Sequence, residues 1–145
     1  MFDELEHYKQ QDHFFFQSHQ SLKDVCNAPS NMSGVYVVYA LKNGGIELVY
    51  IGRSGRLKND GTIFIRKAGL GGMKDRLVNG HQFGKVPRRI SWPYVMETEK
   101  IEALDVYWYA THDNIYNDCP RIVKNAILKR YSEIYGQLPR WNKIP

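Results

Sequence analysis

Two β-prone runs separated by a tight turn constrain the fold of this chain more than any other feature of its sequence. Residues 34–40 and 48–52 are rich in Val, Ile and Tyr, and Asn43-Gly44-Gly45 lies between them. A turn sequence of this kind between two such runs is typical of an antiparallel hairpin. We therefore expect a hairpin over residues 34–52.

Each strand of this hairpin carries a tyrosine within a short motif. Tyr36 ends Gly34-Val35-Tyr36, and Tyr50 begins Tyr50-Ile51-Gly52. On neighbouring antiparallel strands, the two phenols can line one face of the sheet. One tyrosine alone would indicate only a strand, because tyrosine favours strands in general. Two tyrosines in paired motifs point to a shared site.

The rest of the chain predicts one more strand and two helices. Apolar and polar residues alternate over residues 104–111, as they do in a half-buried strand. Residues 73–79 and 120–135 predict helices, with Gly80 and Gly136 at the position that ends a helix. The expected fold class is therefore α+β, with a small, mainly antiparallel sheet flanked by helices.

The chain is expected to form an extension followed by one domain. Residues 1–30 predict an N-terminal helical extension, because apolar residues recur at roughly helical spacing. Residues 31–145 then predict a single globular unit with its own core. Within this unit, residues 54–72 are rich in glycine and basic residues. The β-prone run at residues 62–65 is expected to form a small extra hairpin or an ordered loop.

Positive charge is concentrated in one segment of the chain. The net charge is +5, but residues 53–89 alone contain ten Lys and Arg against two acidic residues. Such a segment attracts phosphate backbones, and a solvated surface loop is the alternative interpretation. The residues expected to bind nucleic acid are Arg53, Arg56, Lys58, Arg66, Lys67, Lys74, Arg88 and Arg89.

The sequence speaks against a membrane or disulfide-rich protein. No apolar run is long enough to span a membrane, and the acidic N-terminus is unlike a signal peptide. Cys26 and Cys119 are too few and too isolated for a disulfide framework or a zinc site. We therefore expect a cytoplasmic protein with no membrane partner.

The paired tyrosine motifs resemble those of the GIY-YIG nuclease family, which cleaves phosphodiester bonds in DNA. The resemblance covers about residues 33–142. In that family, a helix after the hairpin bears an arginine that contacts the scissile phosphate. Met73-Lys74-Asp75-Arg76-Leu77 is similar to that helix, which implies this role for Arg76. The gap between Gly52 and Arg76 is longer than usual for the family, which implies an insertion at about residues 54–72. Arg66 is then a rival for this role, but its surroundings do not look helical.

Two later residues extend the resemblance. Some members of the family carry a histidine just after this arginine, which implies that His81 could accept a proton from water or from a tyrosine. A polar residue after a helix end is the alternative interpretation of His81. Residues 138–142 resemble the segment after the family's last catalytic helix, which implies that Asn142 hydrogen-bonds the active-site network.

Lys124 departs from the family pattern. The family places at this position a glutamate that ligates a single catalytic divalent metal, Mg²⁺ or Mn²⁺. A protonated lysine cannot coordinate such an ion and would repel it. Glu133 cannot substitute, because nine residues turn it to the opposite side of the helix. Three alternatives stay open: a carboxylate from a loop, an impaired site without metal, or an altered residue.

Two functions follow from the resemblance. The first is a GIY-YIG-type DNA endonuclease that hydrolyses phosphodiester bonds with one divalent metal. In it, Tyr36 or Tyr50 would take a proton from the attacking water, with a pKa lowered by Arg76. The second is a non-catalytic module on the same scaffold that binds DNA or RNA, in which Lys124 adds to phosphate affinity. A structural protein that associates through its N-terminal aromatic segment is a more distant alternative.

Overall fold

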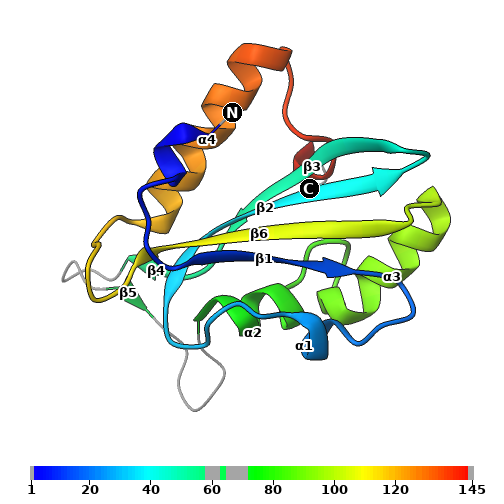
Figure 1. The fold of residues 1–145 in the computed structure, drawn as a ribbon, viewed down its shortest axis with the longest axis horizontal. Coiled ribbons are helices and arrows are strands. Elements are labelled where there is room, and N and C mark those ends of the chain that lie inside the picture. The colour runs from blue at the N-terminus through cyan, green and yellow to red at the C-terminus, as the bar shows by residue number, and fades with distance from the viewer. Residues whose placement is uncertain (1, 58–62, 65–71, 144–145) are drawn as a thin grey trace.

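The centre of the structure is a four-stranded antiparallel sheet. The computed structural model describes residues 2–57, 63–64 and 72–143, and Figure 1 shows the arrangement of its elements. The strand order is β1-β6-β2-β3, and every neighbouring pair is antiparallel. The α+β fold class is therefore confirmed. The strands are β1 (Gln11–Phe16), β2 (Ser33–Lys42), β3 (Gly45–Arg53) and β6 (Ala103–His112).

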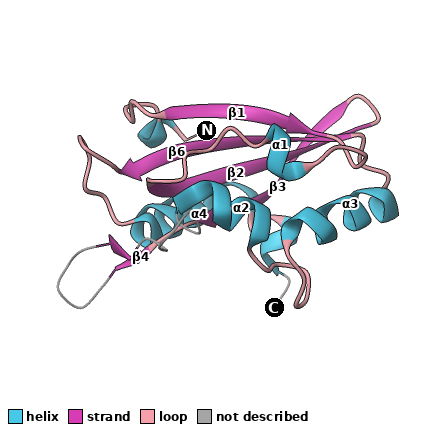
Figure 2. Cartoon of the chain, turned by 90° about the horizontal axis from the view of Figure 1, so that it is seen from below, coloured by secondary structure: helices cyan, strands magenta, loops and turns pink. Residues whose placement is uncertain are grey.

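Helices cover both faces of this sheet. Among the described residues, α4 and α3 lie toward opposite ends of the sheet, and α2 lies between α3 and the β4–β5 end (Figures 1 and 2). No helix in the described parts of the chain combines the length and apolar character needed to cross a bilayer. The helices are α1 (Leu22–Val25), α2 (Gly72–Asn79), α3 (Arg88–Glu99) and α4 (Pro120–Tyr135), with 3-10 turns η1 (Asp3–Leu5) and η2 (Arg140–Lys143).

The predicted hairpin is present as β2 and β3. The strands are joined by a two-residue loop, since Lys42 pairs with Gly45. Asn43 and Gly44 both have positive φ, 52° and 76°, as a type I′ hairpin turn requires. The predicted strand at residues 104–111 is likewise present within β6.

The helical prediction for the N-terminal residues is wrong over β1. There, Phe14 and Phe16 are buried while Phe15 is 54% exposed, which is the two-residue alternation of a strand. β1 pairs with β6 along its whole length and so adds an edge strand to the sheet. The sheet therefore crosses the boundary predicted between residues 1–30 and 31–145.

The alternation along β2 divides the interior into two clusters. Val35 and Val37 face one side, where they pack with Ile127 of α4 and with Leu5 of η1. Even-numbered residues of β2 face the other side, where the cluster includes residues of α1, α2 and α3. Tyr36 belongs to this second cluster, so the predicted catalytic tyrosine points away from the α4 side of the sheet.

α3 has no counterpart among the predicted elements. Pro93 lies inside this helix, where it cannot donate the hydrogen bond of a normal helical residue. The helix forms nevertheless because Trp92 and Met96 are fully buried in the cluster that contains Tyr36. Burial of an amphipathic face thus outweighs the local effect of the proline.

A two-stranded ribbon follows β3. β4 (Arg56–Leu57) pairs antiparallel with β5 (Ile63–Phe64). β5 coincides with the run at residues 62–65 that predicts a small extra hairpin. Figure 2 shows this ribbon projecting from one end of the protein, away from the four-stranded sheet.

Candidate functional site

Tyr36 and Tyr50 lie side by side, as their motifs predict. Their ring centroids are 6.2 Å apart, and the ring planes are inclined at 38°. The Tyr36 ring is fully buried, and its hydroxyl donates to the carbonyl oxygen of Arg53 at 3.2 Å. The phenols therefore belong to one site on the side of the sheet opposite α4.

Gly52 makes room for both rings. A Cβ at this position would lie 2.6 Å from Cε2 of Tyr50 and closer still to Cε2 of Tyr36. Any side chain at Gly52 would therefore push the rings apart. Gly34 has a similar role, because a Cβ there would clash with the carbonyl oxygen of Tyr109 on β6. The glycines of the two motifs thus have steric reasons to be glycine.

Arg88 is a buried part of this site and not a surface cation. Its side chain is 1% exposed, which corrects the prediction that it contacts nucleic acid from the surface. Its guanidinium carbon lies 5.5 Å from the ring centroids of both Tyr36 and Tyr50. Its Nη2 donates to the Tyr50 hydroxyl at 3.2 Å. The guanidinium therefore fixes the position of the Tyr50 ring and its oxygen.

The remaining donors of Arg88 hold the surrounding backbone. Nη1 donates to the carbonyl oxygen of Arg76 at 2.6 Å, and Nε donates to Oε1 of Gln82 at 2.9 Å. Gly80 ends α2 as predicted, but it does not adopt a positive φ. Glycine is needed at this position because neighbouring atoms lie very close to it. A Cβ there would clash with Nη1 of Arg88 and with the Arg76 carbonyl oxygen.

Arg76 lies on α2 with an exposed side chain. The helix that the resemblance implies is therefore present, and the charge of Arg76 acts on both Tyr50 and Lys124. Arg76 does lower the pKa of Tyr50, as expected, but the net shift of that pKa is upward. Burial and the neighbouring Tyr36 raise the pKa of Tyr50, and they outweigh the opposing effects of Arg88 and Arg76. Tyr50 is thus a neutral phenol at neutral pH.

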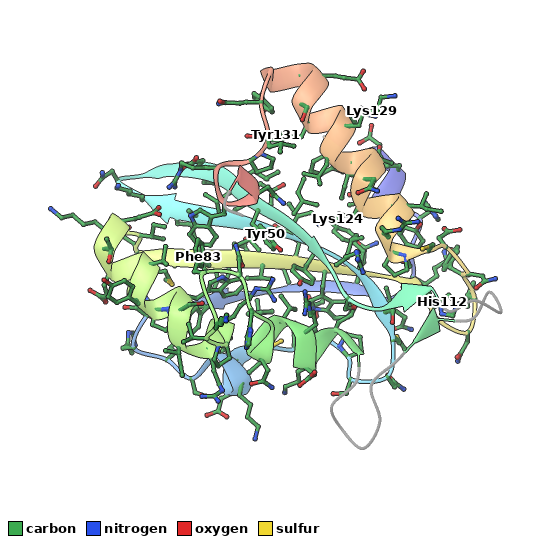
Figure 3. The ribbon with its side chains drawn as sticks, turned by 180° about the vertical axis from the view of Figure 1, so that it is seen from behind. Tyr50, Phe83, His112, Lys124, Lys129 and Tyr131 are labelled. Carbon is green, nitrogen blue, oxygen red and sulfur yellow. The ribbon has the colours of Figure 1, made fainter. Side chains whose placement is uncertain are left out.

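Lys124, on α4, interacts through its charge with arginines around this site. Its pKa is lowered, first by burial and then by the positive charges of Arg53, Arg76 and Arg88. Figure 3 shows Lys124 close to Tyr50 in that view, while Lys129 lies farther along α4. We call Arg53, Arg76, Arg88 and Lys124 the cationic cluster.

The residues of this site do not fit a divalent metal. No group of three or more His, Cys, Asp or Glu side chains in the described part of the chain could hold an ion. At position 124, where the resemblance would imply a metal-ligating carboxylate, the chain has an ammonium group. A cationic cluster of this kind suits an anion instead.

Asn142 is attached to the second tyrosine motif. Its Nδ2 donates to the carbonyl oxygen of Ile51, and its Oδ1 accepts from the Ile51 N–H, both at 2.9 Å. β3 is an edge strand, so the outer backbone groups of Ile51 would otherwise lack a strand partner. Asn142 therefore fixes η2 to the strand that carries Tyr50.

The other residues predicted for the site are more peripheral. His81 is exposed, and its backbone forms an isolated bridge with Pro87. Arg53 donates from Nη1 to the Gly55 carbonyl at 2.6 Å, and Arg89 is exposed and donates from Nε to Oδ1 of Asn79 at 3.2 Å. Lys74 is half-buried on α2, and the backbone of Arg56 lies in β4. Lys58, Arg66 and Lys67 lie outside the described residues.

Sequence reasoning missed Gln82 and Trp92. Oε1 of Gln82 accepts from Nε of Arg88 and from Nε1 of Trp92 at 3.1 Å. Nε2 of Gln82 is buried and has no hydrogen-bond partner among the described residues. No local pattern in the sequence indicates this network.

Comparison of the chain with protein-family models, curated proteins and solved structures found no match.

Proposed function

We propose that this chain binds nucleic acid by holding a backbone phosphate at the cationic cluster beside Tyr50, on a scaffold of GIY-YIG type. The observation that carries the proposal is the positive charge around Lys124. Among the described residues, the charged groups that act on its ammonium are three arginines. Like charges held together repel one another, and a bound phosphate relieves that repulsion.

The donors of the cluster suit a phosphate in shape as well as in charge. The guanidinium of Arg76 is on an exposed side chain of α2, where a ligand can reach it. Tyr50 keeps its proton at neutral pH, so its hydroxyl can donate. A planar guanidinium fork and a hydroxyl together match the oxygens of a phosphodiester.

A polymer suits the surroundings of the site better than a small phosphate compound. The segment of residues 53–89, which supplies three members of the cluster, carries ten Lys and Arg against two acidic residues. Arg89 and Lys74 extend the positive charge along α2 and α3. An extended cationic surface attracts several phosphates of one strand at once.

Fluorescence anisotropy with a labelled duplex and a labelled single strand tests this proposal. We expect binding at low salt that weakens steeply as salt is added, and that EDTA does not change. Lys124→Ala should weaken binding by roughly fivefold or more. Lys129→Ala is the matched control, because Lys129 is exposed on the same helix.

Three outcomes would contradict the proposal. One is the absence of binding to either probe at low salt. Another is an equal effect of Lys124→Ala and Lys129→Ala on affinity. The third is a fall in DNA affinity in both variants without any change in the salt dependence of binding.

Phosphodiester hydrolysis is the second candidate function, and the geometry of the tyrosines favours it. Tyr36 and Tyr50 lie side by side, and Asn142 is hydrogen-bonded to the strand that carries Tyr50, which supports this candidate. The missing feature is a carboxylate at position 124. We therefore expect little cleavage by the unaltered chain, and cleavage after Lys124→Glu if this residue alone was lost.

Plasmid nicking in Mg²⁺ or Mn²⁺ distinguishes the two candidates. Lys129→Glu makes the same charge change at an exposed position and should remain inactive. Nicking by the unaltered chain that disappears in Tyr36→Phe would show that binding is not the whole function. Nicking only by Lys124→Glu would identify the lost carboxylate as the reason for inactivity. Absence of nicking in both forms would contradict the second candidate.

A further inference from the structure

A second concave site lies on the opposite face of the sheet from Tyr50. It is a cavity of about 180 Å³, smaller than the pockets that enclose whole drug-sized ligands. Tyr39 and Tyr107 line it and pack against the apolar cluster on the α4 side, whereas Tyr50 packs against the other cluster. We call this cavity the tyrosine corner; its lining residues are Tyr39, Leu41, Ile46, Asp105 and Tyr107.

Two aromatic rings form the walls of the tyrosine corner. The rings of Tyr39 and Tyr107 meet nearly at right angles, at 79°, with their centroids 5.6 Å apart. His13 stacks on one face of Tyr107, with ring centroids 4.6 Å apart, so a group placed in the corner can contact only the other face of that ring together with Tyr39. The faces of aromatic rings carry partial negative charge, so they attract cations.

A carboxylate adds a full negative charge to these walls. The Asp105 side chain is 13% exposed, and its Oδ1 pairs with Nδ1 of His13 at 2.8 Å. Its charge acts on both tyrosines: burial is the main cause that raises the pKa of each, and Asp105 raises each pKa further. Among the described residues that line the cavity there is no lysine or arginine. The charged side chain on its wall is therefore an acid, on a protein with a net charge of +5.

We propose that the tyrosine corner binds the methylated ammonium group of a small choline-like molecule. Methyl groups on the cation contact the ring faces and need no hydrogen-bond acceptors, which suits walls made of Tyr39, Tyr107, Leu41 and Ile46. The charge is spread over the methyl groups, so such a cation loses less hydration energy on entry than an ammonium ion does. Asp105 supplies the compensating charge at the side of the cavity.

Choline chloride and 3,3-dimethyl-1-butanol provide a direct test. The alcohol is the uncharged carbon analogue of choline and has nearly the same shape. We titrate each into the full chain at constant ionic strength and follow the tyrosine resonances by NMR. We expect choline to bind with a dissociation constant on the order of 1 mM, as for a single small cation. The alcohol should bind at least about tenfold more weakly.

Substitutions in the cavity then locate the binding. Tyr39→Leu should weaken choline binding about tenfold, while Tyr39→Phe, which keeps the ring, should change it less than about threefold. Tyr94→Leu is the matched control, because Tyr94 is 74% exposed on α3, outside the tyrosine corner. Asp105→Asn keeps the shape of the carboxylate and should also weaken choline binding several-fold. Circular dichroism establishes that each variant is folded.

Two results would overturn the assignment. One is equal binding of choline and its uncharged analogue to the unaltered chain, which needs no variant. The other is an equal loss of choline binding in Tyr39→Leu and Tyr94→Leu. The assignment does not depend on the proposed nucleic-acid function, because the two sites lie on opposite faces of the sheet. Choline at these concentrations should therefore leave DNA affinity unchanged beyond the effect of an equal amount of NaCl.

Discussion

The buried guanidinium of Arg88 donates a hydrogen bond of 3.2 Å to the hydroxyl of Tyr50. The same guanidinium also binds the carbonyl oxygen of Arg76 and the side chain of Gln82. One side chain from the first turn of α3 thus connects β3, the end of α2 and the loop between the helices. The geometry of the site depends on this connection, because Arg88 holds both Tyr50 and the backbone of Arg76.

Arg88→Met should therefore destabilise the protein by about 2–4 kcal/mol. The substitution leaves the Tyr50 hydroxyl, the Arg76 carbonyl and Oε1 of Gln82 with fewer hydrogen bonds in a buried place. Arg89→Met is the matched control at an exposed position on the same helix and should cost less than about 0.5 kcal/mol. Urea unfolding followed by circular dichroism measures both free energies. Equal effects would contradict the role given to Arg88.

Gly52→Ala should destabilise the protein because its new methyl group would collide with the rings of Tyr36 and Tyr50. Overpacking of this kind costs about 1–3 kcal/mol. Gly45→Ala on the same strand is the control: the nearest atom to its Cβ would be 3.4 Å away, and it should cost less than about 1 kcal/mol. Thermal unfolding of the two variants distinguishes them, and a shift in the tyrosine fluorescence of Gly52→Ala alone would show that the rings have moved.

The local parts of the structure could be predicted from the sequence, and the long-range parts could not. Asn43 and Gly44 encode the hairpin in two residues, because few other residues adopt positive φ. Gly136 ends α4 for the same local reason, with φ of 74°. Turn chemistry of this kind needs no knowledge of the rest of the fold.

The burial of Arg88 depends instead on a partner 38 residues away in the chain. An arginine in a basic segment is most often exposed, so the sequence favoured a surface role for Arg88.

β1 was missed for a related reason. Three consecutive phenylalanines show no clear period, and only the pairing with β6 makes this segment a strand.

Asn142→Ala should release η2 from the edge of the sheet. The variant loses both hydrogen bonds to the backbone of Ile51, for which we expect a cost of about 1–3 kcal/mol. Asn125→Ala is the control, since Asn125 is exposed on α4. Hydrogen exchange provides the specific measurement: the amide of Ile51 should exchange faster in Asn142→Ala and not in Asn125→Ala. Unchanged exchange at Ile51 would contradict the role of Asn142.

DNA affinity should fall as pH rises through the lowered pKa of Lys124. Only the protonated ammonium attracts a phosphate, and in the free protein it loses its proton at a lower pH than an ordinary lysine. Lys124→Arg stays charged throughout, so its affinity should depend less on pH. Anisotropy titrations between pH 7 and pH 10 at constant ionic strength measure both profiles. Identical profiles would show that Lys124 does not contact the phosphate.

Lys124→Met should stabilise the free protein at neutral pH while weakening its binding to DNA. The pKa of Lys124 is lower in the folded chain than in the unfolded chain, so the unfolded chain binds more protons between these two pKa values. The stability of the unaltered protein therefore rises with pH over that interval, as the cost of the buried charge is removed.

The gain from Lys124→Met should be below about 1 kcal/mol, because the side chain is only half-buried and solvent screens its charge. Lys129→Met, at an exposed position on the same helix, should show no such gain. Urea unfolding at several pH values measures the difference between each variant and the unaltered chain, and for Lys124→Met this difference should shrink as pH rises. A difference that stays constant with pH would mean that packing of the new side chain, and not the charge of Lys124, causes the change. A residue that costs stability in the free protein and strengthens DNA binding is what a phosphate-binding role for Lys124 requires.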